Sequence, residues 1–327
     1  MKAVVCKEYG MADKLVLENN WQEPELGENQ VLIEIKASGL NFPDVLMMQG
    51  KYQNQPDLPF VSGGECAGVV IAVGSKARRV NVGDKVIAMV GYGAFAEQVA
   101  ADENLVFPMP DGLSFEQAAG VGITYFTSYH ALVQRANIQP GETLLVLGAA
   151  GGVGVTAIEL GKLLGAKVIA AASSEEKLEL CRTMGADELI NYSKATLKDE
   201  IKRLTNGRGV DVVYDPVGGD FAEPALRSMA WGGRYLVIGF ASGPIPKIPL
   251  NLTLLKGLSI VGVFWGRFTM EEPERNIANI HELWACFAKG QLKPVVTDLF
   301  TLDQYEQAYN CMIERRARGK VIITLAE

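Results

Sequence analysis

The chain has 327 residues, of which 48% are hydrophobic and 21% are charged, and its formal net charge is −7. This composition excludes wholesale disorder, and at roughly 100–200 residues per domain the length predicts two domains. The acidic balance argues against nucleic acid or an anionic membrane surface as the main partner, because such surfaces attract basic proteins.

The amino terminus reaches charged residues too early for the apolar core of a signal peptide, with Lys2, Lys7 and Glu8 all within its first turns. The most apolar stretch, residues 143–173, is interrupted by charged side chains and predicts no membrane span. Five scattered cysteines form no CxxC pair. We therefore expect reduced thiols in a cytoplasmic protein.

The first third of the sequence is rich in short β patterns. Residues 31–35, 68–73 and 85–89 read as strands bounded by glycine-containing turns, which predicts a compact β-rich module over residues 1–110. The pattern changes at Ser114-Phe115-Glu116-Gln117, a capping-box sequence that predicts the start of a helical run to about residue 134.

Residues 143–265 alternate apolar strands with helices. This alternation predicts a parallel sheet covered on both faces, with six strands in the doubly wound order 3-2-1-4-5-6. The expected strands are 143–147, 167–172, 188–192, 210–215, 234–239 and 258–263, and the expected helices are 153–164, 175–184, 196–205 and 221–229.

The remaining tail contains too little to form a core alone. It carries helix patterns at 274–289 and 303–316 and strand patterns at 295–297 and 321–325. We therefore expect it to return to the first module.

A glycine loop is the strongest functional signal. The strand 143–147 runs into a loop whose glycines permit a tight turn and a close approach of the backbone to a pyrophosphate at a helix amino terminus. The spacing is one residue longer than GxGxxG, and its position at the head of a βαβ unit favours cofactor binding over a merely close helix–strand contact. The loop consists of Gly148, Ala149, Ala150, Gly151, Gly152, Val153 and Gly154.

The end of the second strand indicates which dinucleotide is bound. A carboxylate there would bind the ribose 2′-hydroxyl of NAD, but the sequence is Ala172-Ser173-Ser174, with Lys177 one turn later. Small hydroxyls and a cation suit a 2′-phosphate and favour NADP. Two alternatives remain: Ser173 and Glu176 could form a capping box, and Lys177 could be a solvated helix residue.

The motifs together resemble the zinc-free NADPH:quinone oxidoreductase branch of the medium-chain dehydrogenase/reductase superfamily, over essentially the whole chain. The resemblance implies an α/β protein with a GroES-like β-rich domain (1–120 and 266–327) and a Rossmann doubly wound parallel sheet (121–265). The matching segments are Met1–Ala3, Gly39–Asp44, Gly50–Tyr52, Pro59–Glu65, Val82–Val86, Gly148–Gly154, Asp211–Gly219 and Gly319–Val321.

The resemblance also bears on metal binding. Zinc-dependent relatives place a cysteine near Gly39-Leu40-Asn41 and a histidine in a Gly-His-Glu segment, which here reads Gly63-Gly64-Glu65. Catalytic zinc needs three protein ligands, and the two histidines lie on predicted helices. We expect no metal, and therefore the reduction of an electron-poor acceptor rather than alcohol oxidation.

By resemblance, further residues are assigned to the site. Asn41, Tyr52 and Thr124 would face the nicotinamide and substrate, while Lys177 and Tyr192 would hold the 2′-phosphate with Ser173 or Ser174. Arg318 is a further candidate there, although a charge run like Arg315–Arg318 also fits a solvated helix. Phe240, Phe264 and Trp265 follow the last two strands and would either adjoin the nicotinamide or pack a dimer interface.

The leading hypothesis is an NADPH-dependent quinone reductase. The first alternative is reduction of the double bond of an enone, a 2-alkenal or an acyl-CoA, and residues 40–60 show no basic cluster for CoA phosphates. The non-enzymatic alternative is an NADPH-binding structural or interaction protein. The resemblance further implies a homodimer through the Rossmann domain.

Overall fold

The computed structural model describes residues 1–325, and the chain divides into two compact units. The first combines residues 1–123 with the chain from Lys293 onward, and the second comprises residues 124–292. The sequence predicts that the second domain ends at residue 265, whereas this unit ends at Leu292. It extends further because helix α10 (Pro273–Ala288) is bonded to the same unit: Gln134 donates to Asn279 at 2.7 Å, and Tyr129 donates to Glu282.

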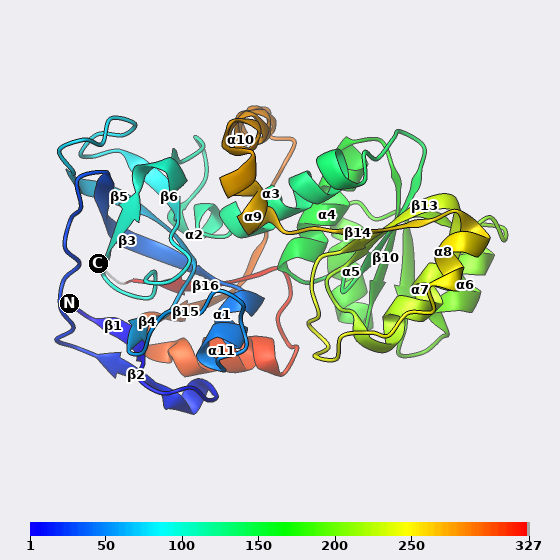
Figure 1. Cartoon of the computed structure of the whole chain (residues 1–327), viewed down its shortest axis with the longest axis horizontal. Helices are drawn as coiled ribbons and strands as arrows, with labels where there is room; N and C mark the ends of the chain where they lie inside the picture. The colour runs from blue at the N-terminus through cyan, green and yellow to red at the C-terminus, as the bar shows by residue number, and fades with distance from the viewer. Residues whose placement is uncertain (326–327) are drawn as a thin grey trace. The chain divides into compact units, whose positions relative to one another are not determined.

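The first unit is built on two β-sheets, as expected for a β-rich module (Figure 1). The larger sheet has the order β15-β16-β3-β5-β6-β8, with β7 also paired to β3, and the smaller has the order β2-β1-β4. The strands are β1 (Ala3–Cys6), β2 (Leu15–Glu18), β3 (Gln30–Leu40), β4 (Phe60–Val61), β5 (Glu65–Val73), β6 (Lys85–Met89), β7 (Gln98–Asp102), β8 (Val106–Pro108), β15 (Val296–Thr301) and β16 (Lys320–Thr324); the helices are α1 (Phe42–Met48), α2 (Phe115–Ala118) and α11 (Tyr305–Ile313).

The tail from Lys293 onward returns to the first unit, as the sequence predicted, while its helix at 274–289 belongs to the second unit. Strand β16 pairs antiparallel with β3, in a register that places Val321 beside Leu40 and Ile322 beside Gly39. In Figure 1 the red C-terminal elements accordingly lie among the blue N-terminal ones. One buried cluster joins Val4 of β1, Val45 of α1, Tyr309 of α11 and Ile323 of β16, so both parts of the chain share one core.

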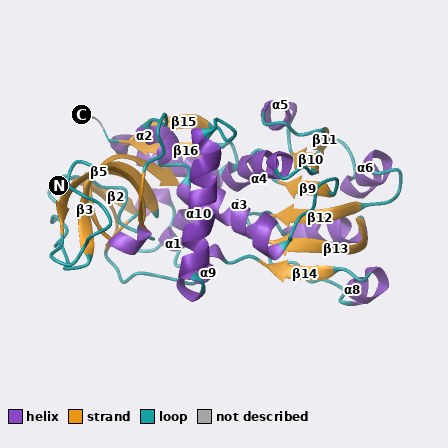
Figure 2. Ribbon diagram, turned by 90° about the horizontal axis from the view of Figure 1, so that it is seen from above, coloured by secondary structure: helices purple, strands orange, loops and turns teal. Residues whose placement is uncertain are grey.

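The second unit contains a six-stranded parallel sheet with the strand order β11-β10-β9-β12-β13-β14 (Figure 2). This is the predicted doubly wound order 3-2-1-4-5-6. Its strands are β9 (Thr143–Leu147), β10 (Lys167–Ala172), β11 (Glu188–Asn191), β12 (Val210–Asp215), β13 (Met229–Val237) and β14 (Ser259–Gly262); its helices are α3 (Gly122–Tyr129), which continues as a π-helical stretch (His130–Arg135), α4 (Gly152–Leu163), α5 (Glu175–Thr183), α6 (Leu197–Leu204), α7 (Ala222–Arg227), α8 (Asn251–Lys256), α9 (Trp265–Glu271) and α10.

Both faces of this sheet are buried, which explains why its strands read as continuous apolar runs. On one face, Leu145 and Ile169 pack with Ile201 of α6 and Leu226 of α7. The alternate residues, such as Leu144 and Val168, are also fully buried, and helix α4 packs against β9 and β10. No helix among the described residues is both long and apolar enough to cross a bilayer.

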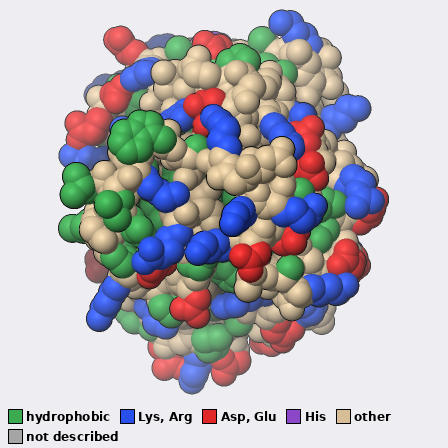
Figure 3. Space-filling view, turned by 90° about the vertical axis from the view of Figure 1, so that its right-hand side faces the viewer, with side chains coloured by type: hydrophobic (Ala, Val, Ile, Leu, Met, Phe, Trp, Pro, Cys, Tyr) green, Lys and Arg blue, Asp and Glu red, His purple; other side chains and the backbone are tan. Residues whose placement is uncertain are grey.

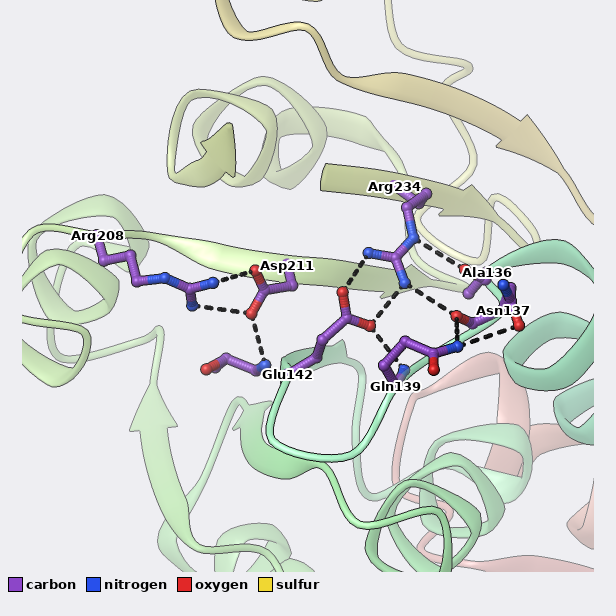
Figure 4. A network of polar contacts seen from close by, with 8 residues as sticks. Ala136, Asn137, Gln139, Glu142, Arg208, Asp211 and Arg234 are labelled. Carbon is purple, nitrogen blue, oxygen red and sulfur yellow. Dashed lines mark hydrogen bonds and ion pairs between the residues drawn. The ribbon is translucent and has the colours of Figure 1, made fainter. Parts of the chain in front are cut away.

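A polar network joins the amino-terminal ends of β9, β12 and β13 (Figure 4). Asp211 accepts the backbone N–H of Thr143 at 2.8 Å and binds Arg208 through both carboxylate oxygens. Arg234 binds both oxygens of Glu142 at 2.7 Å and donates to the carbonyl of Ala136 at 2.8 Å. The network connects three strands at their amino-terminal ends. The glycine loop lies at the opposite, carboxyl ends of the strands.

Candidate functional site

The glycine loop connects β9 to α4 at the carboxyl end of the central strand, as predicted. Gly148 has a φ of +56°, and a Cβ there would lie 2.7 Å from Val217 Cγ2. A Cβ at Gly154 would lie 2.5 Å from the carbonyl oxygen of Gly148. These two glycines are therefore required by the turn and by the close packing of helix on strand.

Gly151 has a different environment. Its φ is −81°, and a Cβ would meet only the carbonyl oxygen of Gly148, at 3.4 Å. It is the N-cap of the twelve-residue helix α4 and supplies no side chain to cap the helix. The first amides of α4, from Gly152 and Val153 onward, therefore present an anion-binding helix terminus, and the loop residues Ala149 and Ala150 are small enough to leave it clear.

A lysine side chain from helix α5 lies beside the residue that follows the end of β10. The Lys177 ammonium lies 3.5 Å from Ser173 Oγ, while Ser174 Oγ caps α5 by accepting the Lys177 N–H at 3.3 Å. The alternative capping box of Ser173 with Glu176 is wrong, because α5 begins one residue later and Ser174 is its N-cap. Ser173 is thus left to face Lys177, and the two groups form a small site suited to a phosphate.

One acidic residue near this site, Glu175, is paired with neighbouring side chains. Glu175 accepts a hydrogen bond from Lys194 at 2.9 Å and another from Asn191 at 2.7 Å. These bonds, that from Lys194 above all, lower the pKa of Glu175. Tyr192 lies beside the end of β10, where its N–H donates to the Ala172 carbonyl at 3.2 Å, and its ring packs on Phe221 at 4.5 Å. The second unit therefore brings Ser173, Lys177 and Tyr192 to one sheet edge.

The next turn is shaped by a buried carboxylate that the sequence did not single out. Asp215, at the end of β12, accepts the N–H groups of Val217 and Gly218 at 2.7 and 2.8 Å and a hydrogen bond from Tyr235. Burial raises the pKa of Asp215. Phe240 packs on the same turn, since a Cβ at Gly218 would lie 2.8 Å from its ring.

The other predicted residues of the second unit differ in their availability. Thr124 is buried, and its carbonyl accepts from Thr156 Oγ1 at 3.3 Å. The Trp265 indole donates to Asn276 at 3.0 Å and its ring packs near Phe126, so it is engaged within the unit. Phe264 is 45% exposed.

The predicted residue Asn41 lies in a buried polar cluster of the first unit. Its Nδ2 donates to Glu65 Oε1 at 2.9 Å and to the Gly39 carbonyl at 3.2 Å, and its Oδ1 accepts from Lys320 Nζ at 2.5 Å. Lys320 also binds Glu65 at 2.6 Å. Both amide hydrogens of Asn41 are therefore used, and only its oxygen can accept a bond from a ligand.

Asp44 is hydrogen-bonded to Asn41 and lies close enough to Tyr52 to affect its pKa. It caps α1 by accepting the Asn41 N–H at 2.7 Å, and burial raises its pKa to about 7 despite the neighbouring Lys320. Tyr52 is half-buried against the same core, and burial together with the nearby Asp44 charge raises its pKa. Arg318 belongs to the first unit and stands before Gly319, whose φ is +60°.

The region expected to hold zinc in metal-dependent relatives has no histidine. Gly64 occupies that position, and a Cβ there would lie 3.4 Å from Asp44. Among residues 1–325, no three His, Cys, Asp or Glu side chains are grouped to hold a metal ion. His130 is buried and stacks on Phe268 at 4.0 Å, and His281 is exposed on α10.

Sequence reasoning missed Glu65 and Lys320 as site residues, although both lay inside motifs quoted for the resemblance. A signal was present: Glu65 is the only charged residue between Asp57 and Lys76. A lone charge inside an apolar run of this kind needs a buried partner. The sequence could not identify which of many cations supplied it.

A β-rich unit closed by the chain's tail and a doubly wound sheet with a glycine loop define a medium-chain dehydrogenase/reductase. Residues 27–111 match the alcohol dehydrogenase GroES-like domain, and residues 152–282 match the zinc-binding dehydrogenase family. A quinone oxidoreductase-like protein 2 homolog of Nematostella vectensis is 39% identical over 325 residues, covering 98% of this chain and 88% of the relative. Human quinone oxidoreductase is 33% identical, covering 99% and 98%. The chain belongs to the quinone oxidoreductase branch of this superfamily and is an oxidoreductase.

Solved structures agree. Escherichia coli quinone oxidoreductase complexed with NADPH matches with a TM-score of 0.92 and 28% identity, covering 99% of this chain and 100% of the other. The CurK enoyl reductase matches with a TM-score of 0.87 and 28% identity, covering 99% of each chain.

Proposed function

We propose that this enzyme is an NADPH-dependent quinone reductase that works without a metal ion. The observation that carries the proposal is the end of β10, where Lys177 faces Ser173 and no carboxylate occupies the position that would bind an NAD ribose. The Escherichia coli relative whose structure contains NADPH supports the same cofactor.

The residues of the second unit fit this cofactor. The helix terminus at Gly151 and Gly152 would bind the pyrophosphate, and Ser173, Lys177 and Tyr192 would bind the 2′-phosphate, with Arg318 and Ser174 as further candidates. Phe240 and Phe264, which follow β13 and β14, and Trp265 adjoin the carboxyl edge where the nicotinamide would lie. When bound, NADPH supplies the hydride.

The first unit contributes orientation rather than acid catalysis. Asn41 has its hydrogens engaged, so it would accept a bond from the nicotinamide amide or ribose. Burial raises the pKa of Tyr52 further above its ordinary value, so the phenol stays protonated and would donate a hydrogen bond to the acceptor's oxygen. Thr124, near the start of the second unit, is placed by its buried contact with Thr156. Hydride transfer and one proton convert the quinone to a quinol, and water can supply that proton.

A second candidate function is reduction of a conjugated double bond. The similarity to an enoyl reductase favours it, and hydride addition to an enone, a 2-alkenal or an acyl-CoA would use the same cofactor. The third candidate is a protein that binds NADPH through the same glycine loop and reduces no acceptor.

The deciding experiment follows NADPH absorbance with 9,10-phenanthrenequinone, a 2-alkenal and acryloyl-CoA in parallel, with NADH as the cofactor control. We expect the fastest turnover with the quinone and NADPH. Turnover with an alkene alone would replace the quinone assignment by the second candidate. NADPH binding by calorimetry with no turnover would leave the third.

We further propose a homodimer formed through the second unit. Strand β14 lies at the edge of the parallel sheet, and hydrophobic side chains gather along the left of the face in Figure 3. We call the exposed residues on and beside β14 and α8 the β14–α8 patch: Trp231, Ile245, Leu250, Leu254, Leu255 and Ile260, of which Trp231 and Leu254 are each 79% exposed. Such a concentration of apolar side chains at an open sheet edge marks an interaction surface.

The five cysteines are all free and four are buried, which supports the proposal of a reducing, cytoplasmic location. Fractionation of cells carrying a tagged chain would test it, because recovery in an organelle would contradict it.

A further inference from the structure

The buried cluster around Asn41 is assembled from distant parts of the sequence. Lys320 comes from the first residue of β16, Glu65 from the first residue of β5, and Asn41 from the residue before α1. The side chains of Lys320 and Glu65 are 6% and 0% exposed, and Asn41 is 6% exposed. Three polar side chains thus meet where water does not compete for their hydrogen bonds.

We propose that Lys320 and Glu65 are positioning residues that hold the amide of Asn41 in a single orientation for the reaction. The inference rests on the proposed role of Asn41. An ammonium group can only donate and a carboxylate can only accept. Lys320 therefore selects the oxygen of the amide, and Glu65 selects its nitrogen. If the amide were flipped, its NH2 group would face the Lys320 ammonium, donor against donor, and its oxygen would face the Glu65 carboxylate, acceptor against acceptor.

The orientation decides what Asn41 can bind. The second Nδ2 hydrogen donates to the Gly39 carbonyl, so the amide has no hydrogen left to donate to a ligand, and a ligand could approach only its oxygen. Asn41 would accept a hydrogen bond from a ligand amide or hydroxyl and would reject a ligand carbonyl. The ion pair thus makes Asn41 an acceptor and never a donor.

The surrounding backbone is shaped to fit the pair. A Cβ at Gly39 would lie 2.7 Å from Glu65 Oε1 and 2.8 Å from Lys320 Cε, and a Cβ at Gly120 would lie 2.8 Å from Lys320 Cγ. The second oxygen of Glu65 accepts the Ile123 N–H at 2.9 Å. Buried ion pairs can often be replaced by apolar groups without loss of stability, so stability alone does not account for the Lys320–Glu65 pair.

The test uses the double variant Lys320→Met/Glu65→Gln, because a single change would leave an unpaired buried charge. We expect kcat for quinone reduction to fall about tenfold, with the KM for NADPH and the melting temperature near those of the parent, since misplacing a positioning group reduces the rate. Adding the two changes to Asn41→Ala should reduce kcat no further. The matched control is Arg234→Met/Glu142→Gln, an ion pair of the second unit outside the site, and kcat should be unchanged.

A spectroscopic readout makes the outcome independent of activity. The side-chain amide signals of Asn41, assigned by their loss in Asn41→Ala, should shift in the double variant of the parent enzyme. Unchanged signals, or an equal fall in kcat in the presence and absence of Asn41, would overturn the proposal. Shifted signals with an unchanged kcat in both the double variant and Asn41→Ala would instead refute the catalytic role proposed for Asn41, and with it the purpose of the pair.

Discussion

The ammonium group of Lys177 lies 3.5 Å from the hydroxyl oxygen of Ser173, across the first turn of α5. Ser174 caps the helix, so the Ser173 hydroxyl does not serve as its cap and instead faces the Lys177 ammonium at the end of β10. The nearby Glu175 is paired with Lys194 and Asn191 and repels an anion less than a free carboxylate would.

Replacing Lys177 with alanine should raise the KM for NADPH about 10–100-fold and leave the KM for NADH unchanged. The reason is the loss of one charge-assisted hydrogen bond, which contributes about 1.5–3 kcal/mol, with about 1.4 kcal/mol for each factor of ten. Steady-state kinetics with both cofactors measures the effect. Lys198→Ala, an exposed lysine on α6, is the control and should change neither value.

Two glycines of the same loop should respond differently to alanine. Gly151→Ala should preserve the melting temperature, because its φ of −81° suits alanine and its Cβ has space, but should weaken NADPH binding at least tenfold by obstructing the pyrophosphate.

Gly154→Ala should destabilise the second unit, because its Cβ would lie 2.5 Å from a backbone oxygen. Calorimetric titration and thermal unfolding distinguish the two effects. Equal loss of stability in both variants would contradict this assignment of the glycines.

Asp44→Asn should change the pH dependence of the stability of the first unit. Burial raises the pKa of Asp44 from 3.8 to about 7, so the folded chain binds one more proton than the unfolded chain between these pH values. Stability should therefore fall, relative to the asparagine variant, as pH rises through this range, by on the order of 4 kcal/mol.

Urea unfolding of both proteins at a series of pH values measures this difference. Lys320 and Glu65 face Asp44 with opposite charges, and Tyr52 and Tyr309 face it as neutral phenols. A difference that stays constant from pH 4 to 8 would mean that Asp44 is ionised in the folded protein throughout.

Arg234→Met should destabilise the second unit by about 2 kcal/mol at pH 7, because a partly buried carboxylate and the Ala136 carbonyl both lose their donor. The Arg234 hydrogen bond lowers the pKa of Glu142 below 4.5. The contribution of the Arg234–Glu142 pair to stability is therefore present above that pH and is lost as pH falls through the pKa of Glu142 in the folded protein.

Denaturant titration measures the free energy of unfolding of the parent and of Arg234→Met at pH 7 and pH 3. The difference between the two proteins should be smaller at pH 3. Arg227→Met breaks an exposed pair with Glu223 and should cost well under about 1 kcal/mol. NADPH turnover should be unaffected, since the network lies at the opposite edge of the sheet.

Leu254→Glu should convert the proposed dimer to a monomer, because it places a charge within the apolar β14–α8 patch. Light scattering after size exclusion gives the mass directly. Val82→Glu, at a 61% exposed position of the first unit, is the matched control. A parent enzyme that is monomeric at micromolar concentration, or a dimer that survives Leu254→Glu, would exclude this surface as the interface.

The sequence predicted most of the fold because the relevant signals are local. The apolar strand 143–147 and the glycines after it appear as neighbours in the chain, and the predicted strands 167–172 and 210–215 match β10 and β12 to the residue. The same locality explains why the predicted boundary at 265 differs from the division at 292: α10 contacts the second unit through Asn279 and Glu282, whose partners lie 145 and 153 residues away.

The site was less predictable for the same physical reason. The serine and lysine at β10 lie within five residues of one another and could be read together. Glu65 and Lys320 are 255 residues apart, and their pairing depends on the register of β16 against β3. A single sequence contains no local pattern that reports this register.

The placement of β16 has a consequence for biosynthesis. Residues 124–292 form one uninterrupted segment, so the second unit has all its strands once residue 292 has left the ribosome. Strand β3 must wait for a neighbour that is translated after residue 319. The larger sheet of the first unit therefore stays incomplete until β16 is translated, and until then Glu65 lacks its partner Lys320.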